Sequence, residues 1–549
     1  MFVSVCCLSK GESQKLIFHL ICSIWEEEDI PGHWVEALLK ILSKPGDQAD
    51  ASNCRGIQML EVSCKILGNV MRSRSRLISE KLDHEAQCGF RQNRGTCDGT
   101  WNVIMSMAKR KEHGAETWVL LLDLVKAFGR VPRELLWRIM AKFGYPPKFI
   151  RVLRKLHTGI KVHFNMNGIE KIVQSTIGVK QGDLLGPDLF NILIAATMMI
   201  WRKRYKENNP PICTFRTKED FVLGSGSRGN TRRWDLGGKK LSGVEEFEVV
   251  DSEYADDTAV LFVSRDAMIE GAPSIIEAFR DCRMEVHIKQ PGDNKKAKTI
   301  ALFVAVQGHE YDRYHADGGG AGNFGGTDLS DITLPCGGKI PVVEKARYLG
   351  SMIHRNGKCN SDVDSRIEKA AAAFSRLRPL VFNNKAILIE AKVAAYLTIV
   401  MSILLYGSEM WALTAASRRK LRSFHNRCVR SMAGISMWHV KENRMTTAEV
   451  QKVIGIASVD TYMMRRRLRW IGHVSRMEWS RVPRKLLSSW VYQKRPIGRP
   501  CMRWAESIER DLANAKIPRT KWHILAKDKS KWRSKIRHIG KTKKTKKKN

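Results

Sequence analysis

The sequence lacks the paired cysteines that bind zinc or build a disulfide framework. Its 13 cysteines are spread singly over 549 residues, apart from the adjacent Cys6 and Cys7, and no C-x-x-C pair occurs. This pattern argues against a zinc ribbon and against a disulfide-rich secreted domain. Reduced thiols are typical of proteins inside the cell, so we expect an intracellular location, nuclear or cytoplasmic.

Long hydrophobic runs are also missing. Residues 1–8 do not have the charged-then-apolar build of a signal peptide. The longest apolar run, residues 393–406, is shorter than the ~20 residues that span a bilayer, and charged residues bound it on both sides. We therefore expect no membrane contact and interpret this run as a buried core helix.

Acidic residues are few beside basic ones. There are 56 Asp and Glu against 94 Lys and Arg, which gives a formal net charge of +38. Such a surplus favours a polyanionic partner, either nucleic acid or an anionic membrane surface. Since no membrane segment is expected, nucleic acid remains. With 43% hydrophobic residues the chain can bury real cores, so it is not a disordered protein.

Two adjacent carboxylates, Asp256 and Asp257, lie between two short runs of strand character. Neighbouring side chains on a strand point to opposite faces, so both can serve one site only if a tight turn joins the strands. A buried pair of like charges is costly unless a cation neutralises it. The pattern predicts a divalent-metal site on a β-hairpin, and the alternative for an isolated pair is an ordinary acidic turn.

A third carboxylate, Asp123, interrupts the apolar run at residues 118–124. A strand buried on both faces should not contain an unpaired carboxylate, so Asp123 should lie at the end of the strand or face a cation. A helix is expected next, over residues 133–143. With Asp256 and Asp257, this residue completes a set suited to two-metal phosphoryl transfer with Mg²⁺ on a palm-like sheet.

The remaining pattern is mainly helical. We expect helices over residues 16–25, 34–42 and 189–201, and an amphipathic helix over residues 363–377. From residue 418 onward, Arg and Lys interleave with tryptophans such as Trp470, Trp504 and Trp532. Cations alternating with aromatics can track a phosphate backbone and stack on bases, which predicts a nucleic-acid-binding region that ends in a disordered lysine tail.

In order along the chain, the motifs LDLVKAF, GVKQGDLLGPDLF, YADDTAV, a Lys-Thr stretch and RYLGS resemble the reverse transcriptases of non-LTR (LINE-type) retrotransposons. NCRGI and QCGFR upstream, and LYGSEMW and RLRWIGHVSRM downstream, extend the resemblance over nearly the whole chain. It implies an α+β, right-hand polymerase fold with a basic, mainly helical C-terminal region. The implied parts are fingers at residues 1–105, a reverse transcriptase domain at 25–353 with its palm at approximately 115–340, thumb helices at 354–415, and the basic nucleic-acid-binding region at 416–549.

The resemblance also implies roles for single residues. Asp123, Asp256 and Asp257 would be the catalytic carboxylates that bind Mg²⁺, with Mn²⁺ as an alternative. Lys298 would donate a proton to pyrophosphate, although Lys295 and Lys296 are close enough to compete. The nucleotide and template would contact Phe128, an aromatic gate under the incoming sugar, and Gln181, Gly182, Arg55 and Arg91. The primer grip would be Tyr348, Leu349 and Gly350. The implied partners are an RNA template, a DNA primer or target, and dNTPs.

The chain departs from the family pattern at three positions. Gly129 stands where the family has Asp, and Leu184 and Gly186 replace Pro and Ser. No endonuclease motif or zinc knuckle is found, so we expect a truncated copy that lacks the endonuclease domain. One hypothesis is an active RNA-directed DNA polymerase, favoured by the intact carboxylates; the other is a degenerate or domesticated fold that binds RNA or DNA without copying it. A polymerase that makes RNA or extends telomeres is disfavoured by Phe128.

Overall fold

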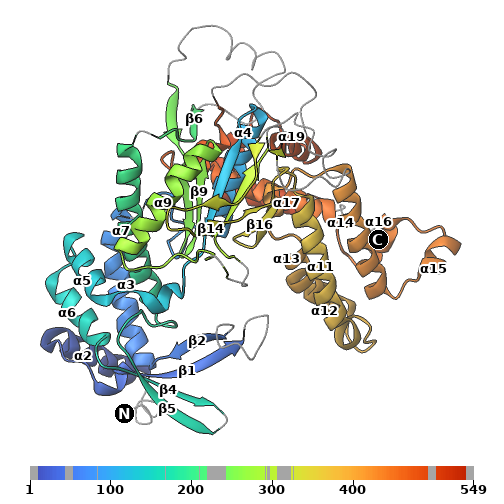
Figure 1. Cartoon of the computed structure of the whole chain (residues 1–549). Helices are drawn as coiled ribbons and strands as arrows, with labels where there is room; N and C mark the ends of the chain where they lie inside the picture. The colour runs from blue at the N-terminus through green and yellow to red at the C-terminus, as the bar shows by residue number, and fades with distance from the viewer. Residues whose placement is uncertain are drawn as a thin grey trace.

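The computed structural model describes residues 10–43, 54–82, 84–166, 168–208, 210–218, 243–290, 292, 297–305, 323–324, 327–491 and 503–539. Within these ranges a central sheet is flanked by a smaller sheet on one side and by an arm of helices on the other (Figure 1). The expected α+β class, with a palm sheet between fingers and thumb, is confirmed.

The central sheet has five strands. In spatial order they are β15 (Val342–Val343), β10 (Ile300–Val304), β3 (Thr117–Leu122), β9 (Asp257–Phe262) and β8 (Asp251–Tyr254). Strand β3 pairs antiparallel with both β9 and β10, and β8 and β9 form a hairpin. The carboxyl end of β3 therefore lies beside the start of β9.

Alternate side chains of this sheet enter two different cores, as the two-residue period of a strand requires. Trp118, Leu120 and Leu122 pack in a core with α7 (Gly186–Glu207) and α9 (Arg265–Asp281). Val119 and Leu121 pack in a second core with α4 (Thr96–Glu112) and with helices that follow residue 459. Both faces of the sheet are thus covered, which explains why β3 is buried at every position.

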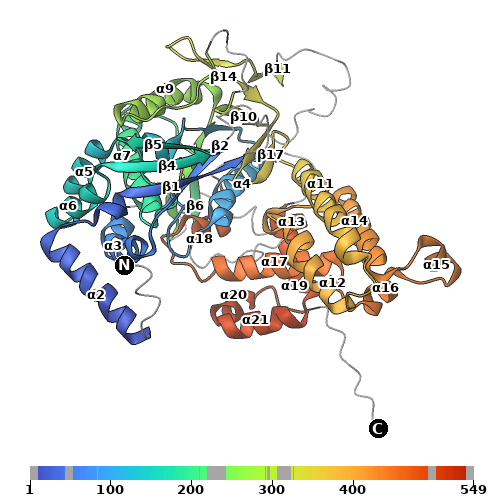
Figure 2. The same cartoon turned by 90° about the horizontal axis from the view of Figure 1, so that it is seen from below.

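The smaller sheet belongs to the fingers (Figure 2). Its order is β2 (Cys54–Met59), β1 (Glu36–Ser43), β4 (Ile160–Met166) and β5 (Ile169–Ser175). The expected helix over residues 34–42 is wrong, because a short 3-10 turn at Gly32–Val35 leads directly into β1. The pairing of β1 with β2 and β4 overrides the local preference of these residues for a helix. The expected helix at residues 16–25 is confirmed within α2 (Lys10–Glu27).

The thumb is a bundle with a third core of its own, which extends from Val363 to Met463 and so continues beyond residue 415. Residues 393–404 are helical and 405–406 form a turn, but the expectation of a fully buried helix is wrong. Tyr396 and Val400 are buried while Ser402 and Ile399 are exposed, because one face packs on the bundle and the other meets solvent. The helices of the bundle are α11 (Asn360–Leu377), α12 (Ile389–Ala395), α13 (Met401–Leu404), α14 (Ala415–Ala433) and α16 (Thr447–Val453). Among helices in the described ranges, none has the length and apolar character that a membrane span requires.

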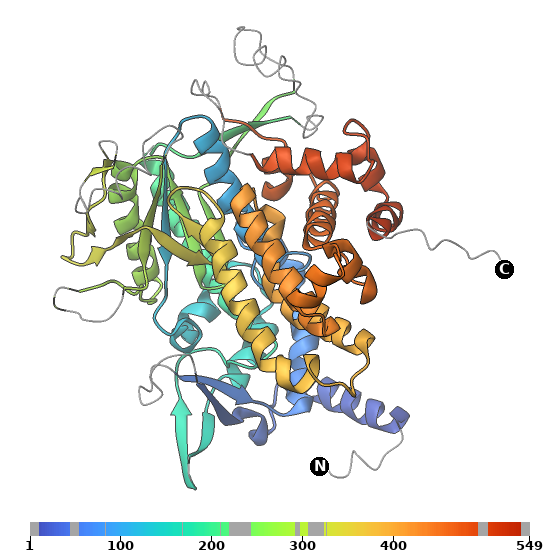
Figure 3. The same ribbon diagram turned by 90° about the vertical axis from the view of Figure 1, so that its right-hand side faces the viewer.

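The helices after residue 459 lie against the palm beside the thumb (Figure 3). Trp470, Trp504 and Trp532 are all buried, and Trp101 of α4 meets the rings of Trp470 and Trp504 edge-on at centroid distances of 5.6 and 4.7 Å. The expectation that these tryptophans stack on bases is therefore wrong, since their large apolar surface fastens the C-terminal helices to α4. The lysine tail lies outside the described residues.

Candidate active site

The β8–β9 hairpin carries the paired carboxylates. Tyr254 pairs with Asp257, so Ala255 and Asp256 are the two turn residues. Ala255 has a φ of +58°, a conformation that costs a residue with a Cβ about 1–3 kcal/mol and persists only where surrounding contacts enforce it. The hairpin therefore holds Asp256 in a constrained position.

Asp123 meets this hairpin at the same end of the sheet. Leu122 pairs with Thr258 across β3 and β9, so the next residue on β3 is in register with Asp257. The backbone N–H of Asp123 donates to Thr299 Oγ1 at 3.2 Å, and its carbonyl accepts from His287 N at 2.8 Å. The structure thus places the three predicted carboxylates at the same end of the sheet.

The charges of these carboxylates repel one another. Burial, and then the charges of Asp256 and Asp123, raise the pKa of Asp257 to about 6. The pKa of Asp256 is raised mainly by burial and also by Asp123, while nearby Arg55 acts in the opposite direction. Asp123 Oδ2 is buried without a hydrogen-bond partner among the described residues, and Lys298 Nζ lies 3.7 Å from it.

A divalent cation fits this environment, because it would neutralise hard oxygen ligands that now repel each other. In the described part of the chain, no group of three or more His, Cys, Asp or Glu side chains converges closely enough to enclose a metal ion. Mg²⁺ usually keeps water and substrate phosphates in its octahedral shell, so this donor set suits an ion whose shell the substrate completes.

The raised pKa of Asp257 predicts a pH-dependent stability. Its ordinary value of 3.8 rises to about 6 on folding, so the metal-free folded state binds the proton more tightly than the unfolded state. The contribution of Asp257 to the free energy of unfolding is then largest below about pH 4, and it is lost as pH rises to about 6. Thermal melts of wild type and Asp257→Asn between these pH values should diverge, with the variant gaining relative stability as pH rises. A constant difference would contradict the prediction.

Phe128 belongs to a row of aromatic rings that leads to the hairpin. It lies half-buried in the 3-10 turn η3 (Ala127–Arg130) and stacks on Phe190 with a centroid distance of 4.6 Å. Phe90 meets Phe128 edge-on at 6.4 Å and lies 6.2 Å from the ring of Tyr254. Sequence reasoning missed Phe90, although its place inside the QCGFR motif was a usable signal.

Gln181 and Gly182 are attached to the fingers sheet. The carbonyl of Gln181 accepts from Gln58 N of β2 at 2.7 Å. Gly182 has a φ of +123°, and a Cβ at this position would lie 2.3 Å from Gln58 O, so only glycine fits. Arg55 is exposed on the same strand and close enough to act on Asp256.

Arg91 is engaged elsewhere. Its guanidinium donates to Glu80 Oε2 at 2.9 Å and to the carbonyl oxygen of His84 at 2.7 Å, and the residue is buried. These contacts shape the loop before α4. A role for Arg91 in holding triphosphate or template stays a prediction.

The predicted primer grip is the turn of a second hairpin, β16 (Lys345–Tyr348) and β17 (Ser351–His354). Leu349 and Gly350 have φ values of +44° and +82°, as a two-residue type I′ turn requires. The hydroxyl of buried Tyr348 donates to Ser252 O of β8 at 2.8 Å. The turn is therefore anchored beside the β8–β9 hairpin, and contact with a primer stays a prediction. Lys295 and Lys296, the competitors of Lys298, lie outside the described residues.

The departures from the family pattern fit the local packing. A Cβ built on Gly129 meets nothing within 4 Å, so the missing Asp would find space there. Gly178 packs against the backbone of Gly129, with a virtual Cβ only 2.7 Å from its carbonyl oxygen. At Gly186 a Cβ would lie 2.7 Å from Lys180 O, so this turn is closed around glycine. The backbone around the site is thus well packed despite the substitutions.

A mainly antiparallel sheet with carboxylates at one end, between a fingers sheet and a helical thumb, defines a right-hand polymerase fold. Residues 42–290 match the family described as "Reverse transcriptase (RNA-dependent DNA polymerase)", so the chain carries a reverse transcriptase domain. The resemblance predicted from the motifs is thereby confirmed.

Several curated proteins are similar to the chain. A "Putative uncharacterized transposon-derived protein" of Caenorhabditis elegans is 27% identical over 36% of this chain and 72% of its own length. The "RNA-directed DNA polymerase from mobile element jockey" of Drosophila melanogaster is 21% identical over 78% of this chain, but the chain spans only 40% of that protein. Among solved structures, telomerase from Candida tropicalis is 11% identical over 86% of this chain and 73% of its own, with a TM-score of 0.35.

Proposed function

We propose that this chain is the RNA-directed DNA polymerase of a retrotransposon, adding dNTPs to a primer 3′-hydroxyl on an RNA template. The observation that carries the proposal is the placement of Asp123, Asp256 and Asp257 at one end of the palm sheet, near enough for their charges to act on one another. The three residues lie inside the segment that matches the reverse transcriptase family. Relatives named RNA-directed DNA polymerase support the same reading.

The three carboxylates would hold Mg²⁺, or alternatively Mn²⁺. Divalent cations bound there supply charge neutralisation at the triphosphate and lower the pKa of the attacking hydroxyl. Lys298 is near enough to Asp123, at 3.7 Å, to reach the same substrate and to give a proton to the leaving pyrophosphate. Arg55 extends from β2 toward the site and would pair with a phosphate oxygen.

Phe128 would select the sugar by steric overlap with a 2′-hydroxyl, because its stacking on Phe190 keeps the ring in place. Replacing Phe128 with Val should therefore relax selection against NTPs by roughly 10- to 200-fold, the range expected when a few side-chain atoms are removed from a pocket. Single-nucleotide incorporation with matched dNTP and NTP pairs measures the ratio. Phe128→Tyr, which retains the ring, should keep the selectivity, and an unchanged ratio in Phe128→Val would remove Phe128 from this role.

The C-terminal helices would bind the RNA template or the target DNA through basic side chains, since their tryptophans are buried. Burial, and then the charges of Arg465, Arg466, Arg533 and Arg537, lower the pKa of Arg469. Cations so close to one another favour phosphate groups as neutralising partners, with binding that weakens as salt increases. A nuclear or cytoplasmic site of action follows from the proposed partners.

Primer extension tests the proposed function. The 549-residue chain is incubated with a DNA primer annealed to an RNA template, dNTPs and either Mg²⁺ or Mn²⁺. Extension that requires a divalent cation supports the proposal. Salt-sensitive binding to the same hybrid without extension by folded protein would replace it with a fold that only binds nucleic acid.

A further inference from the structure

Residues 86–89 form an additional edge along β8. The N–H of Cys88 donates to Glu253 O at 2.8 Å, and the N–H of Glu253 donates to Ala86 O at 2.9 Å. Gly89 packs so closely on the catalytic turn that a Cβ there would lie 2.4 Å from Ala255 N. This segment is therefore the backing on which the turn of the catalytic hairpin rests.

The side chain of Gln87 joins this backing to the turn. It is 3% exposed, and its Oε1 accepts two hydrogen bonds, from Gly89 N at 2.7 Å and from Ala255 N at 3.1 Å. Ala255 is the left-handed residue immediately before Asp256. One amide oxygen thus holds both the backing segment and the strained turn that presents the carboxylate.

Glu253 fixes which way the amide of Gln87 points. Gln87 Nε2 donates to Glu253 Oε2 at 3.3 Å, so the nitrogen end faces an acceptor and the oxygen end faces two donors. With the amide flipped, its oxygen would face the carboxylate of Glu253, and its NH₂ group would face the N–H groups of Gly89 and Ala255. The orientation therefore depends on Glu253.

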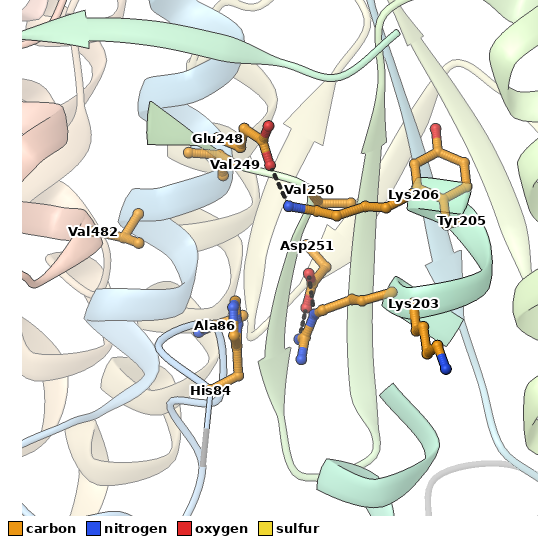
Figure 4. A pocket seen from close by; sticks show the side chains of 11 residues that line it. His84, Ala86, Lys203, Tyr205, Lys206, Glu248, Val249, Val250, Asp251 and Val482 are labelled. Atoms are coloured by element: carbon orange, nitrogen blue, oxygen red, sulfur yellow. Dashed lines mark hydrogen bonds and ion pairs between the residues drawn. The ribbon is translucent and has the colours of Figure 1, made fainter. Parts of the chain in front are cut away.

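Arg202 of α7 holds Glu253 in turn. It donates to Asp251 at 3.1 and 2.6 Å and to Glu253 Oε1, and the two acidic residues are 4% and 1% exposed. Asp251 lines a pocket of about 270 Å³. Figure 4 shows its side chain there, with the Lys206–Glu248 ion pair nearby. A buried guanidinium shared by two carboxylates leaves Glu253 little freedom, since displacing either charge would leave it unpaired.

We propose that Gln87 is a positioning residue for Asp256, set in its orientation by Glu253 and Arg202. The inference deepens the proposed function and rests on it for its catalytic part. Gln87 acts through the Ala255 N–H and does not touch the substrate. Its loss should let the turn relax and Asp256 move, which lowers kcat more than it changes binding of dNTP or primer.

Exchanging the two side chains is the decisive variant. Gln87→Glu alone places two carboxylates opposite each other. In Glu253→Gln alone, the new amide NH₂ group must face a donor, either the guanidinium of Arg202 or the Nε2 of Gln87. In the double variant Gln87→Glu/Glu253→Gln the donor comes from position 253 and the acceptors from position 87. The pattern of donors and acceptors, and the total charge, are then restored. Gln87→Leu removes all three hydrogen bonds, and Gln290→Leu, at an exposed position, is the matched control.

Hydrogen–deuterium exchange on the whole chain tests whether Gln87 holds the turn, and it does so without any measurement of activity. Exchange at the amides of Ala255 and Gly89 should be about tenfold faster in Gln87→Leu and in each single exchange variant, and should return toward wild type in the double variant. The control should match wild type. Unchanged exchange in Gln87→Leu, or no recovery in the double variant, would overturn the proposal.

Primer extension tests whether the loss of Gln87 slows the reaction. In Gln87→Leu, kcat should fall about 10²-fold, as expected for a misplaced catalytic group, while KM for dNTP stays within about twofold. The double variant should recover most of kcat. Normal kcat with faster exchange would overturn the positioning role. If wild type itself fails to extend primers, the proposed function fails, and the exchange measurements alone decide whether Gln87 holds the turn.

Discussion

Replacing Asp256 with Asn is expected to abolish primer extension and, at the same time, to raise the melting temperature of the metal-free protein. Burial and the charge of Asp123 raise the pKa of Asp256, which means that folding works against its negative charge. The neutral amide removes that repulsion but is a poor ligand for a hard cation. A metal ligand that contributes several kcal/mol to the transition state gives a loss of roughly 10³-fold when it is removed.

The two halves of this expectation need separate measurements. Single-turnover extension with saturating Mg²⁺ reports the chemical step, and a thermal melt in a chelator reports stability. Asp281→Asn is a matched control, because Asp281 forms an exposed ion pair with Arg204 at 2.7 Å and such pairs contribute little. A melting temperature below wild type, or extension within tenfold of it, would contradict the assignment of Asp256 as a half-buried metal ligand.

Adding one methyl group at Gly89 should be nearly as damaging as removing a carboxylate. In Gly89→Ala the new Cβ would lie 2.4 Å from Ala255 N and 2.9 Å from Tyr254 C. Both are backbone atoms, so no side-chain rotation can relieve the clash. The hairpin must shift, and a displacement near 1 Å at a catalytic group costs about 10²-fold in rate. Overpacking of this kind also destabilises a fold by about 1–3 kcal/mol.

Gly129→Ala provides the matched comparison, because a Cβ at Gly129 meets nothing within 4 Å. Only Gly89→Ala should lower kcat and the urea midpoint of unfolding, because only Gly89 packs against the backbone of the hairpin turn. Equal behaviour of the two variants would show that the turn does not rest on Gly89. A normal kcat in Gly89→Ala would mean that the hairpin tolerates displacement.

Features encoded by neighbouring residues could be predicted from the sequence. The hairpin around Asp256 and Asp257 follows from two adjacent carboxylates between strand-like runs, and the end of β3 follows from one charge in an apolar run. The predicted helices at residues 133–143 and 189–201 correspond to α5 (Arg133–Lys142) and α7 (Gly186–Glu207). Each depends on a local pattern.

Features that depend on distant partners could not be predicted. Strand β1 forms because Glu36 pairs with Lys161, and nothing in the local pattern of residues 34–42 indicates that partner. Trp504 was expected to stack on bases, yet it packs against Trp101, which lies about four hundred residues earlier in the chain. The role of Gln87 could not be predicted, because it depends on hydrogen bonds to Glu253 and Ala255, which lie far along the chain.

The packing of Trp101 against Trp470 and Trp504 has a consequence for synthesis of the chain. Helix α4 emerges early from the ribosome, whereas its partners emerge hundreds of residues later, so one face of the palm sheet stays uncovered during most of translation. A nascent chain in this state exposes apolar surface that invites aggregation or chaperone binding. The palm can therefore reach its final stability only after the helices around Trp504 have been made, and a ribosome that stops before residue 504 would leave one face of the sheet partly uncovered.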